Sequence, residues 1–257
     1  MRVRFLLFSL ALVGSADAAD QARLNFVACP IVRDTPSVPC WLAEHGGELY
    51  YLGIQTDVSA EFQPPYLGHQ VLVEGRISDK PLICGGVVLE PLRISVMPEL
   101  DRSCNQRLPI DPRYKIDFNP RPPGPSAGRL AYADARPPAP EPVKPPFVEK
   151  AFVIYFDFDD GISFRHPRDL MAIVHYAQET HARHISINGH RGATLLAGGS
   201  VLTESEWIAE RRSRQLKDLL TGAGVTAAIE VAWQTAPVAA DGDEDWRSRS
   251  ADVRVVP

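Results

Sequence analysis

Four cysteines are the residues whose chemistry follows most directly from this sequence. Cys29, Cys40, Cys84 and Cys104 all lie in the N-terminal half of the chain. An even number of cysteines in an oxidising compartment indicates disulfides, and four cysteines allow three pairings. We favour Cys29–Cys40 together with Cys84–Cys104, because short loops close at the lowest entropic cost. A zinc site with four thiolates is the alternative, but such sites usually show a close C-x-x-C spacing that is absent from this sequence.

The first residues have the pattern of an export signal, which would supply that oxidising compartment. Two arginines precede an apolar stretch at residues 5–14, and residues 16–18 form an A-x-A cleavage sequence. We therefore expect residues 1–18 to be a cleavable signal peptide. The mature protein would then reach the periplasm, with the periphery of the outer membrane as one location. A permanent anchor is disfavoured because the apolar stretch is shorter than the roughly 20 residues that span a bilayer.

Other side chains with catalytic or metal-binding chemistry fall into no known arrangement. His181, His184 and His190 are close in the sequence but lack the H-E-x-x-H spacing of a zinc enzyme. The aspartates within residues 157–160 lack the spaced ligands of a calcium loop, so we expect a turn there. No G-x-S-x-G sequence or phosphate-binding loop occurs, and no carboxylate pair stands out for glycoside hydrolysis. We predict a protein that is not an enzyme and that holds no metal or cofactor.

The overall charge argues against a nucleic-acid partner. The 257 residues carry a formal net charge of −5, with a sequence pI near 5.8. A protein that neutralises phosphates normally has a basic excess. The acidic loop at residues 241–245 is expected to be solvated. With 45% hydrophobic residues, the chain can build a core in one or two domains.

The elements expected around the cysteines are mainly strands. Residues 49–55, 69–78 and 86–96 are rich in apolar and β-branched side chains, and glycine and proline separate them. This pattern predicts a small, mainly-β domain over residues 20–110, stapled by two disulfides. GHQVLVEGRIS resembles one strand of an OB-type barrel, a fold that often binds oligonucleotides or oligosaccharides. We favour the interpretation that residues 20–110 form a structural or interaction domain.

A proline-rich linker is expected at residues 119–147, which contain ten of the chain's 23 prolines. Such a composition favours extended polyproline II, which would reach roughly 80 Å and act as a spacer in the envelope. A disordered tether without a set span is the alternative.

Strand and helix patterns alternate in residues 148–257. A helix is expected at residues 168–182, where apolar residues recur at i, i+3, i+4 and i+7. A second helix is expected to begin at Thr203, with Glu206 three residues later as in a capping box. Strands are expected at residues 151–158, 183–189, 228–233 and 251–256. This βαβαββ order predicts a mixed sheet with helices on one face, so the fold class of the chain is α+β.

Several motifs in this segment resemble the OmpA-like peptidoglycan-associating domain. VIYFDFDDG at residues 153–161 is similar to the opening strand of that family, and ISINGH at residues 185–190 is similar to the strand that ends in its GHTD motif. IAERRSRQLKDLLTGAGV at residues 208–225 resembles the family's second helix. Pro237 lies where the family has its P(I/V)A loop. Together the motifs extend over residues 148–257.

The resemblance implies a pocket for the zwitterionic diaminopimelate of the peptidoglycan stem peptide. Family members meet the ligand's ammonium with the Asp of GHTD and its carboxylate with an Arg of the second helix, whose planar fork binds bidentately. Arg212 matches that Arg, whereas Gly192 stands in place of the Asp. Losing one charge-assisted hydrogen bond predicts binding that is about 10- to 100-fold weaker.

Three candidate ligand-binding residues follow from the resemblance. They are Arg212, His190, which is the His of the altered GHTD motif, and Glu204. Glu204 or Glu206, both in an enlarged loop, could replace the missing Asp, although capping the second helix is the alternative role of both glutamates. Arg191, next to His190, would disfavour the ligand's ammonium.

The sequence thus predicts a non-enzymatic cell-envelope protein that associates weakly and non-covalently with peptidoglycan through its C-terminal domain. Its N-terminal domain would contact a second partner, an envelope protein. The alternative is a periplasmic protein-interaction scaffold whose OmpA-like domain has lost peptidoglycan binding. No nucleic-acid partner is expected.

Overall fold

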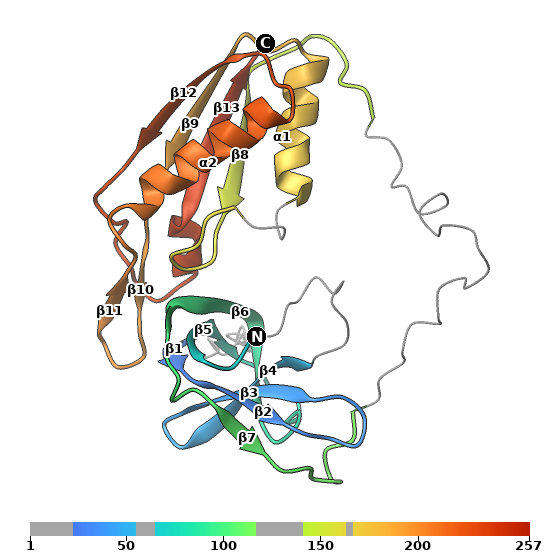
Figure 1. The fold of residues 1–257 in the computed structure, drawn as a ribbon, viewed down its shortest axis with the longest axis vertical. Helices are drawn as coiled ribbons and strands as arrows, with labels where there is room; N and C mark the ends of the chain where they lie inside the picture. Colours follow the sequence, from blue (N-terminus) through green and yellow to red (C-terminus); the bar gives the residue numbers. More distant parts are fainter. Residues whose placement is uncertain (1–22, 55–64, 117–140, 163–166) are drawn as a thin grey trace, which may run out of the picture.

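The described part of the chain contains three hydrophobic clusters, two among the N-terminal strands and one beneath the C-terminal helices (Figure 1). The computed structural model describes residues 23–54, 65–116, 141–162 and 167–257. The expected signal peptide and most of the expected linker lie outside the described residues. Neither of the two α-helices in the described residues is long and apolar enough to cross a membrane.

The N-terminal strands form one seven-stranded sheet. The strands are β1 Arg23–Ala28, β2 Pro30–Arg33, β3 Cys40–His45, β4 Glu48–Ile54, β5 His69–Ile77, β6 Val87–Leu100 and β7 Gln106–Leu108. They pair in the order β1-β5-β6-β4-β3-β2-β7, and only β4–β6 and β2–β7 are parallel. Cys29 alone separates β1 from β2, so the first six strands close on themselves. We call these seven strands the barrel.

Strand β5 shows how the sequence pattern positions side chains in the barrel. Val71 and Val73 point into the barrel core, as the alternation predicts. Glu74 points to the opposite face, yet it is only 5% exposed. A carboxylate is rarely buried without a partner, so the outer face of β5 must be covered by something that supplies one.

The two disulfides predicted from the sequence are present, and no described cysteine is free. The favoured pairing is wrong, because the bonds are Cys29–Cys104 and Cys40–Cys84. In the β2–β3 ladder, Cys40 lies opposite Arg33. Cys29 is four residues before Arg33, about 13 Å along the strand, and a disulfide spans Cα atoms at most about 7 Å apart. Strand pairing, rather than loop length, therefore decides which cysteines meet.

The C-terminal part has a four-stranded mixed sheet with two helices on one face (Figure 1). Its elements are β8 Lys150–Tyr155, α1 Pro167–Glu179, β9 His184–Gly189, β10 Ala193–Leu195, β11 Val201–Thr203, α2 Ile208–Gly222, β12 Ala228–Trp233, the short 3-10 helix η1 Asp245–Ser248 and β13 Ser250–Val256. The sheet order is β12-β9-β13-β8, with β12 parallel to β9 and β13 antiparallel to both neighbours. The βαβαββ order matches the sequence prediction, and the chain is α+β. The hairpin β10–β11, between β9 and α2, was not predicted from the sequence.

The hairpin explains why the predicted start of the second helix is wrong. Thr203 ends strand β11, and α2 begins only at Ile208. Trp207 occupies the N-cap position, where no side chain caps the helix. Backbone pairing of β11 with β10 removes Thr203 from the helix, so Glu206 forms no capping box.

The barrel and the C-terminal part are in direct contact, and Figure 1 shows the β10–β11 hairpin extending to the barrel. Glu74 of the barrel forms an ion pair with Arg249, and both side chains are almost fully buried. Arg93 lies over the ring of Trp246, with its guanidinium carbon 3.4 Å from the ring centre. The partner that β5 requires is therefore Arg249. This contact joins the two parts directly.

The disulfide pairing generates the first prediction. Mapping of unreduced peptides should recover Cys29 linked to Cys104, and Cys40 linked to Cys84. Cys40→Ala combined with Cys84→Ala should lower the free energy of unfolding by about 4 kcal/mol, because it frees a closed loop with a sequence separation of 44 residues. Recovery of a Cys29–Cys40 peptide, or alkylation of all four cysteines without reductant, would contradict the structure.

Candidate functional site

Arg212 lies at the centre of the candidate site, on the first turns of α2, and its side chain is completely buried. A guanidinium has five N–H donors, and here each has an acceptor within the protein. Nε donates to the Asp160 carbonyl at 2.9 Å, and Nη1 and Nη2 donate to the carbonyls of His190 and Asp157 at 3.0 and 3.1 Å. The two remaining donors bind the Glu204 carboxylate at 2.9 and 2.6 Å. No donor of Arg212 is left for a ligand.

Glu204 is as fully engaged as its partner. Its side chain is buried, and its two oxygens also accept from the backbone N–H groups of Gly192 at 2.7 Å and Asp159 at 2.9 Å. A bidentate arginine–carboxylate pair with these additional donors is the arrangement in which a buried charge is well compensated. The ring of Phe156 covers the guanidinium, with its centre 4.6 Å from the Arg212 guanidinium carbon.

The structure thus places two of the three predicted ligand-binding residues together, bonded to each other. The Glu204 carboxylate binds Arg212, as a ligand carboxylate was expected to do. It does not take the expected role of an Asp that binds a ligand ammonium. His190 contributes only its carbonyl to Arg212. The His190 ring instead lies 2.9 Å from a carboxylate oxygen of Asp252. Sequence reasoning did not predict the mutual contact of Arg212 and Glu204, and their role in ligand binding stays a prediction.

Gly192, at the position of the family's Asp, has no space for a side chain. A Cβ atom there would collide with Ser248 Oγ and lie 2.9 Å from Arg249 Cγ. Gly192→Asp therefore cannot restore a ligand contact without displacing the segment around η1. Arg191 also points away from any ligand, since its Nη1 donates to the Thr235 carbonyl at 3.0 Å. Its Nε has no partner within the described chain.

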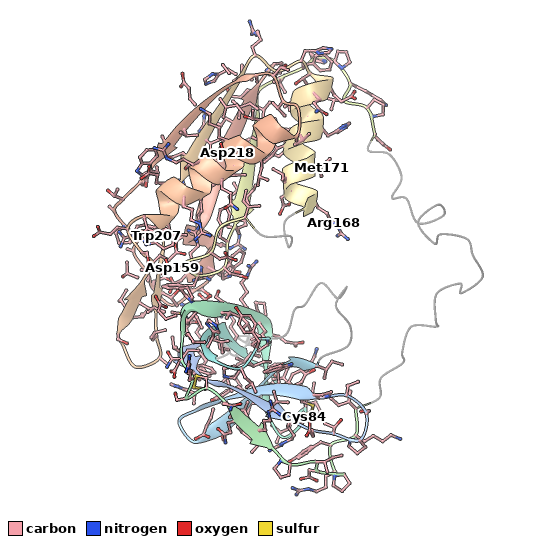
Figure 2. All side chains as sticks on the ribbon, in the orientation of Figure 1. Cys84, Asp159, Arg168, Met171, Trp207 and Asp218 are labelled. Atoms are coloured by element: carbon pink, nitrogen blue, oxygen red, sulfur yellow. A yellow bond between two sulfur atoms is a disulfide. The ribbon has the colours of Figure 1, made fainter. Side chains whose placement is uncertain are left out.

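Asp159 is a residue of the site whose role sequence reasoning missed, because the aspartates of residues 157–160 read as a simple turn. Its carboxylate accepts from the Ser205 backbone N–H at 2.7 Å and from the Ser205 hydroxyl at 2.9 Å. Burial raises the pKa of Asp159, with the nearby Glu204 charge acting in the same direction, while the Ser205 hydrogen bonds oppose the rise. Figure 2 shows Asp159 and Trp207 at the same end of α2, towards the barrel.

The acidic loop at residues 241–245 is docked against the barrel rather than simply solvated, which corrects the sequence prediction. Asp243 forms ion pairs with Arg23 at 3.0 Å and Arg76 at 2.5 Å, both on barrel strands. Asp245 is buried, and it accepts from the backbone N–H of Leu195 at 2.8 Å. The loop is therefore bonded both to the β10–β11 hairpin and to the barrel.

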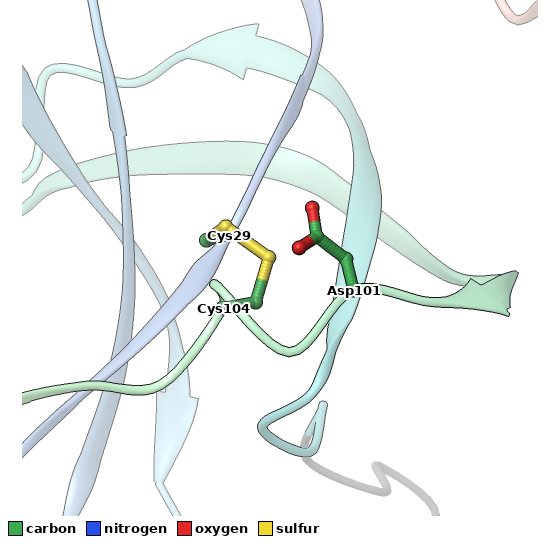
Figure 3. A group of neighbouring side chains, drawn as sticks. All are labelled: Cys29, Asp101 and Cys104. Carbon is green, nitrogen blue, oxygen red and sulfur yellow. A yellow bond between two sulfur atoms is a disulfide. The ribbon is translucent and has the colours of Figure 1, made fainter.

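The only group of three potential metal ligands in the described ranges is Cys29, Asp101 and Cys104, whose ligand atoms lie within 4.8 Å of one another (Figure 3). The two sulfur atoms are bonded to each other in a disulfide, so neither is a thiolate that could bind a metal ion. The four cysteines do not gather at one point either, because each disulfide joins a different pair of segments. These contacts leave no basis for a thiolate zinc site.

Solved structures similar to this chain include two envelope proteins. The peptidoglycan-associated lipoprotein from Burkholderia pseudomallei is 27% identical; the match covers 41% of this chain and 88% of that one, with a TM-score of 0.31. The OmpA-like domain of FopA1 from Francisella tularensis subsp. tularensis SCHU S4 is 12% identical over 42% of this chain and 71% of that one, with a TM-score of 0.32. No family model and no curated protein matches the sequence. The similarity extends over less than half of the chain, and it does not by itself establish a function.

The buried pair generates a stability prediction. Glu204→Gln should lower the free energy of unfolding by about 3–5 kcal/mol, because it leaves the Arg212 charge buried without a counter-charge. Glu206→Gln is the matched control, since Glu206 is exposed and its loss should change stability by no more than about 0.5 kcal/mol. Urea unfolding of both variants would measure the difference. Equal stability of the two variants would show that Glu204 is not the essential partner of Arg212.

Asp159 generates a prediction about pH. A carboxyl whose pKa is raised by folding contributes stability that is complete below its unfolded pKa and is lost as the pH rises through its folded pKa. Asp159→Asn does not titrate and retains an acceptor for the Ser205 N–H. The wild type should therefore lose stability relative to Asp159→Asn as the pH rises above about 4. Urea unfolding across this range tests the sign, and a difference that is constant or moves the other way would refute it.

Proposed function

We propose that this chain is a non-enzymatic protein of the cell envelope whose OmpA-like part acts as an interaction scaffold, with its ligand-binding arginine occupied by its own Glu204. The observation that carries the proposal is the complete internal bonding of the buried Arg212. An incoming carboxylate would have to break this pair. Breaking a buried ion pair costs about 3–5 kcal/mol, which corresponds to a loss of more than about 100-fold in affinity.

Peptidoglycan association through Arg212, His190 and Glu204 is the second candidate function. One observation favours it, namely that Arg212 is positioned to bind a carboxylate and does bind one here. A stem-peptide carboxylate has the same charge and geometry as the Glu204 side chain. This function requires that Glu204 withdraw before the ligand can enter.

For the barrel we propose an OB-type fold and a separate envelope partner. The strand order supports the fold, because β1 and β2 form one bent strand that pairs with both β3 and β5, and β6 joins β4 to β5. If β7 is set aside and β1 and β2 are counted as one strand, five strands remain, and β4–β6 is their one parallel pair, as in a small Greek-key barrel. Two disulfides support a periplasmic location, since they persist in oxidising compartments.

Co-sedimentation with purified peptidoglycan distinguishes the two functions. The wild-type full-length protein should remain in the supernatant at low and at physiological salt, because Arg212 has no free donor. Glu206→Gln, with its exposed substitution, should behave in the same way and controls for a change in net charge. Wild-type protein that pellets at low salt and is released by added salt would contradict the scaffold proposal and support the second candidate.

A further inference from the structure

The barrel contacts the first of two walls that enclose Arg212. This wall is the loop at residues 156–161 after β8, which supplies two of the carbonyls that bind Arg212 and the Asp159 N–H that binds Glu204. The backbone N–H of Phe158, in the middle of this loop, donates to the hydroxyl of the buried Ser95 at 2.9 Å. Ser95 belongs to β6 of the barrel. The conformation of this wall is therefore tied to the barrel.

The second wall is the β10–β11 hairpin, and the barrel holds it as well. The side-chain amide of Asn25, on β1, donates to the Leu195 carbonyl at 3.1 Å. The backbone carbonyl of Asn25 accepts from the Ala197 N–H at 2.8 Å. Glu204 directly follows β11 and Gly192 directly precedes β10, and their backbones bond to each other at 3.1 Å. Glu204 thus lies at the base of the hairpin, and the far end of the same hairpin is bonded to the barrel.

A second buried ion pair joins these contacts. Arg249 donates to Glu74 of the barrel and, at 2.9 Å, to the hydroxyl of Thr194 in the hairpin. Thr194 also donates to Glu74 at 3.3 Å. Arg249 and Glu74 are 1% and 5% exposed, so separating the barrel would leave two charges that must be hydrated again. The barrel is therefore either docked with all these bonds or detached from both walls.

We propose that the docked barrel is a latch that keeps Glu204 on Arg212. While the barrel is docked, Ser95, Asn25 and Glu74 fix both walls and the site is shut. When the barrel leaves, the hairpin loses its outer support, Glu204 can swing out, and Arg212 becomes accessible to a carboxylate from outside. This inference rests on the proposed function only in that Glu204 fills the site. The new element is that the barrel, the N-terminal half of the chain, keeps Glu204 on Arg212.

The test measures the accessibility of Arg212 directly, without peptidoglycan. The full-length protein is treated with phenylglyoxal, which modifies accessible guanidinium groups, and the modification of each arginine is followed by peptide mass spectrometry. Arg214, on the same helix and well exposed, is the internal reference. Small-angle scattering of the same samples reports whether the barrel has separated. Glu74→Gln removes the carboxylate that compensates Arg249 at the interface. Asn25→Ala removes the side-chain bonds to the Leu195 and Gly242 carbonyls, keeps the backbone bond to Ala197, and leaves no buried charge. Asp111→Asn is the control, because Asp111 pairs with Arg113 in an exposed turn.

Arg212 should be protected in the wild type and in Asp111→Asn. In Glu74→Gln the scattering should show separated parts, and Arg212 should react at least 10-fold faster while Arg214 is unchanged. Asn25→Ala should shift both readouts in the same direction, and it decides the question if Glu74→Gln loses its near-ultraviolet circular dichroism. Protection of Arg212 in separated variants would overturn the latch, as would barrels that stay docked in both variants. The peptidoglycan assay can fail or succeed independently of these outcomes.

Discussion

A guanidinium that is removed from water needs an acceptor for each of its donors, and the C-terminal part is arranged around that requirement at Arg212. The loop after β8, the end of β9 and the hairpin base each supply part of the acceptor set. The same loop and hairpin base satisfy the Glu204 oxygens. Because every member is bonded to another, no single element of the site can move without leaving a buried polar group unsatisfied.

The same constraint operates a second time where the barrel meets the C-terminal part. Glu74 sits on an outward-facing position of β5, and it is buried only because Arg249 and Thr194 complete its contacts. The two ion pairs are linked, since Thr194 lies in the hairpin whose base carries Glu204. The hydrophobic clusters of the described residues therefore lie within one part or the other, while the two buried ion pairs are linked across both parts.

This arrangement changes the functional interpretation of the C-terminal part. Its elements follow the order βαβαββ with an added hairpin, and Arg212 already binds a carboxylate of the same chain. Retaining an arginine is therefore not sufficient evidence for ligand binding, because the partner of that arginine can come from the same chain. The proposed roles as scaffold and as latched binding site both follow from this internal occupancy.

The sequence by itself determined the βαβαββ order, three of the barrel strands (β4, β5 and β6) and the presence of two disulfides, because local periodicity and short motifs depend on neighbouring residues. Tertiary structure alone decided three features: which cysteines pair, where α2 begins, and what Arg212 binds. Each depends on which backbone segments pair, such as the β2–β3 register and the hairpin that takes Thr203 out of the helix, and local periodicity does not specify that pairing. Burial of Glu74 has the same origin. Alternation predicts that its face of β5 is exposed to solvent, and docking of the C-terminal part covers that face.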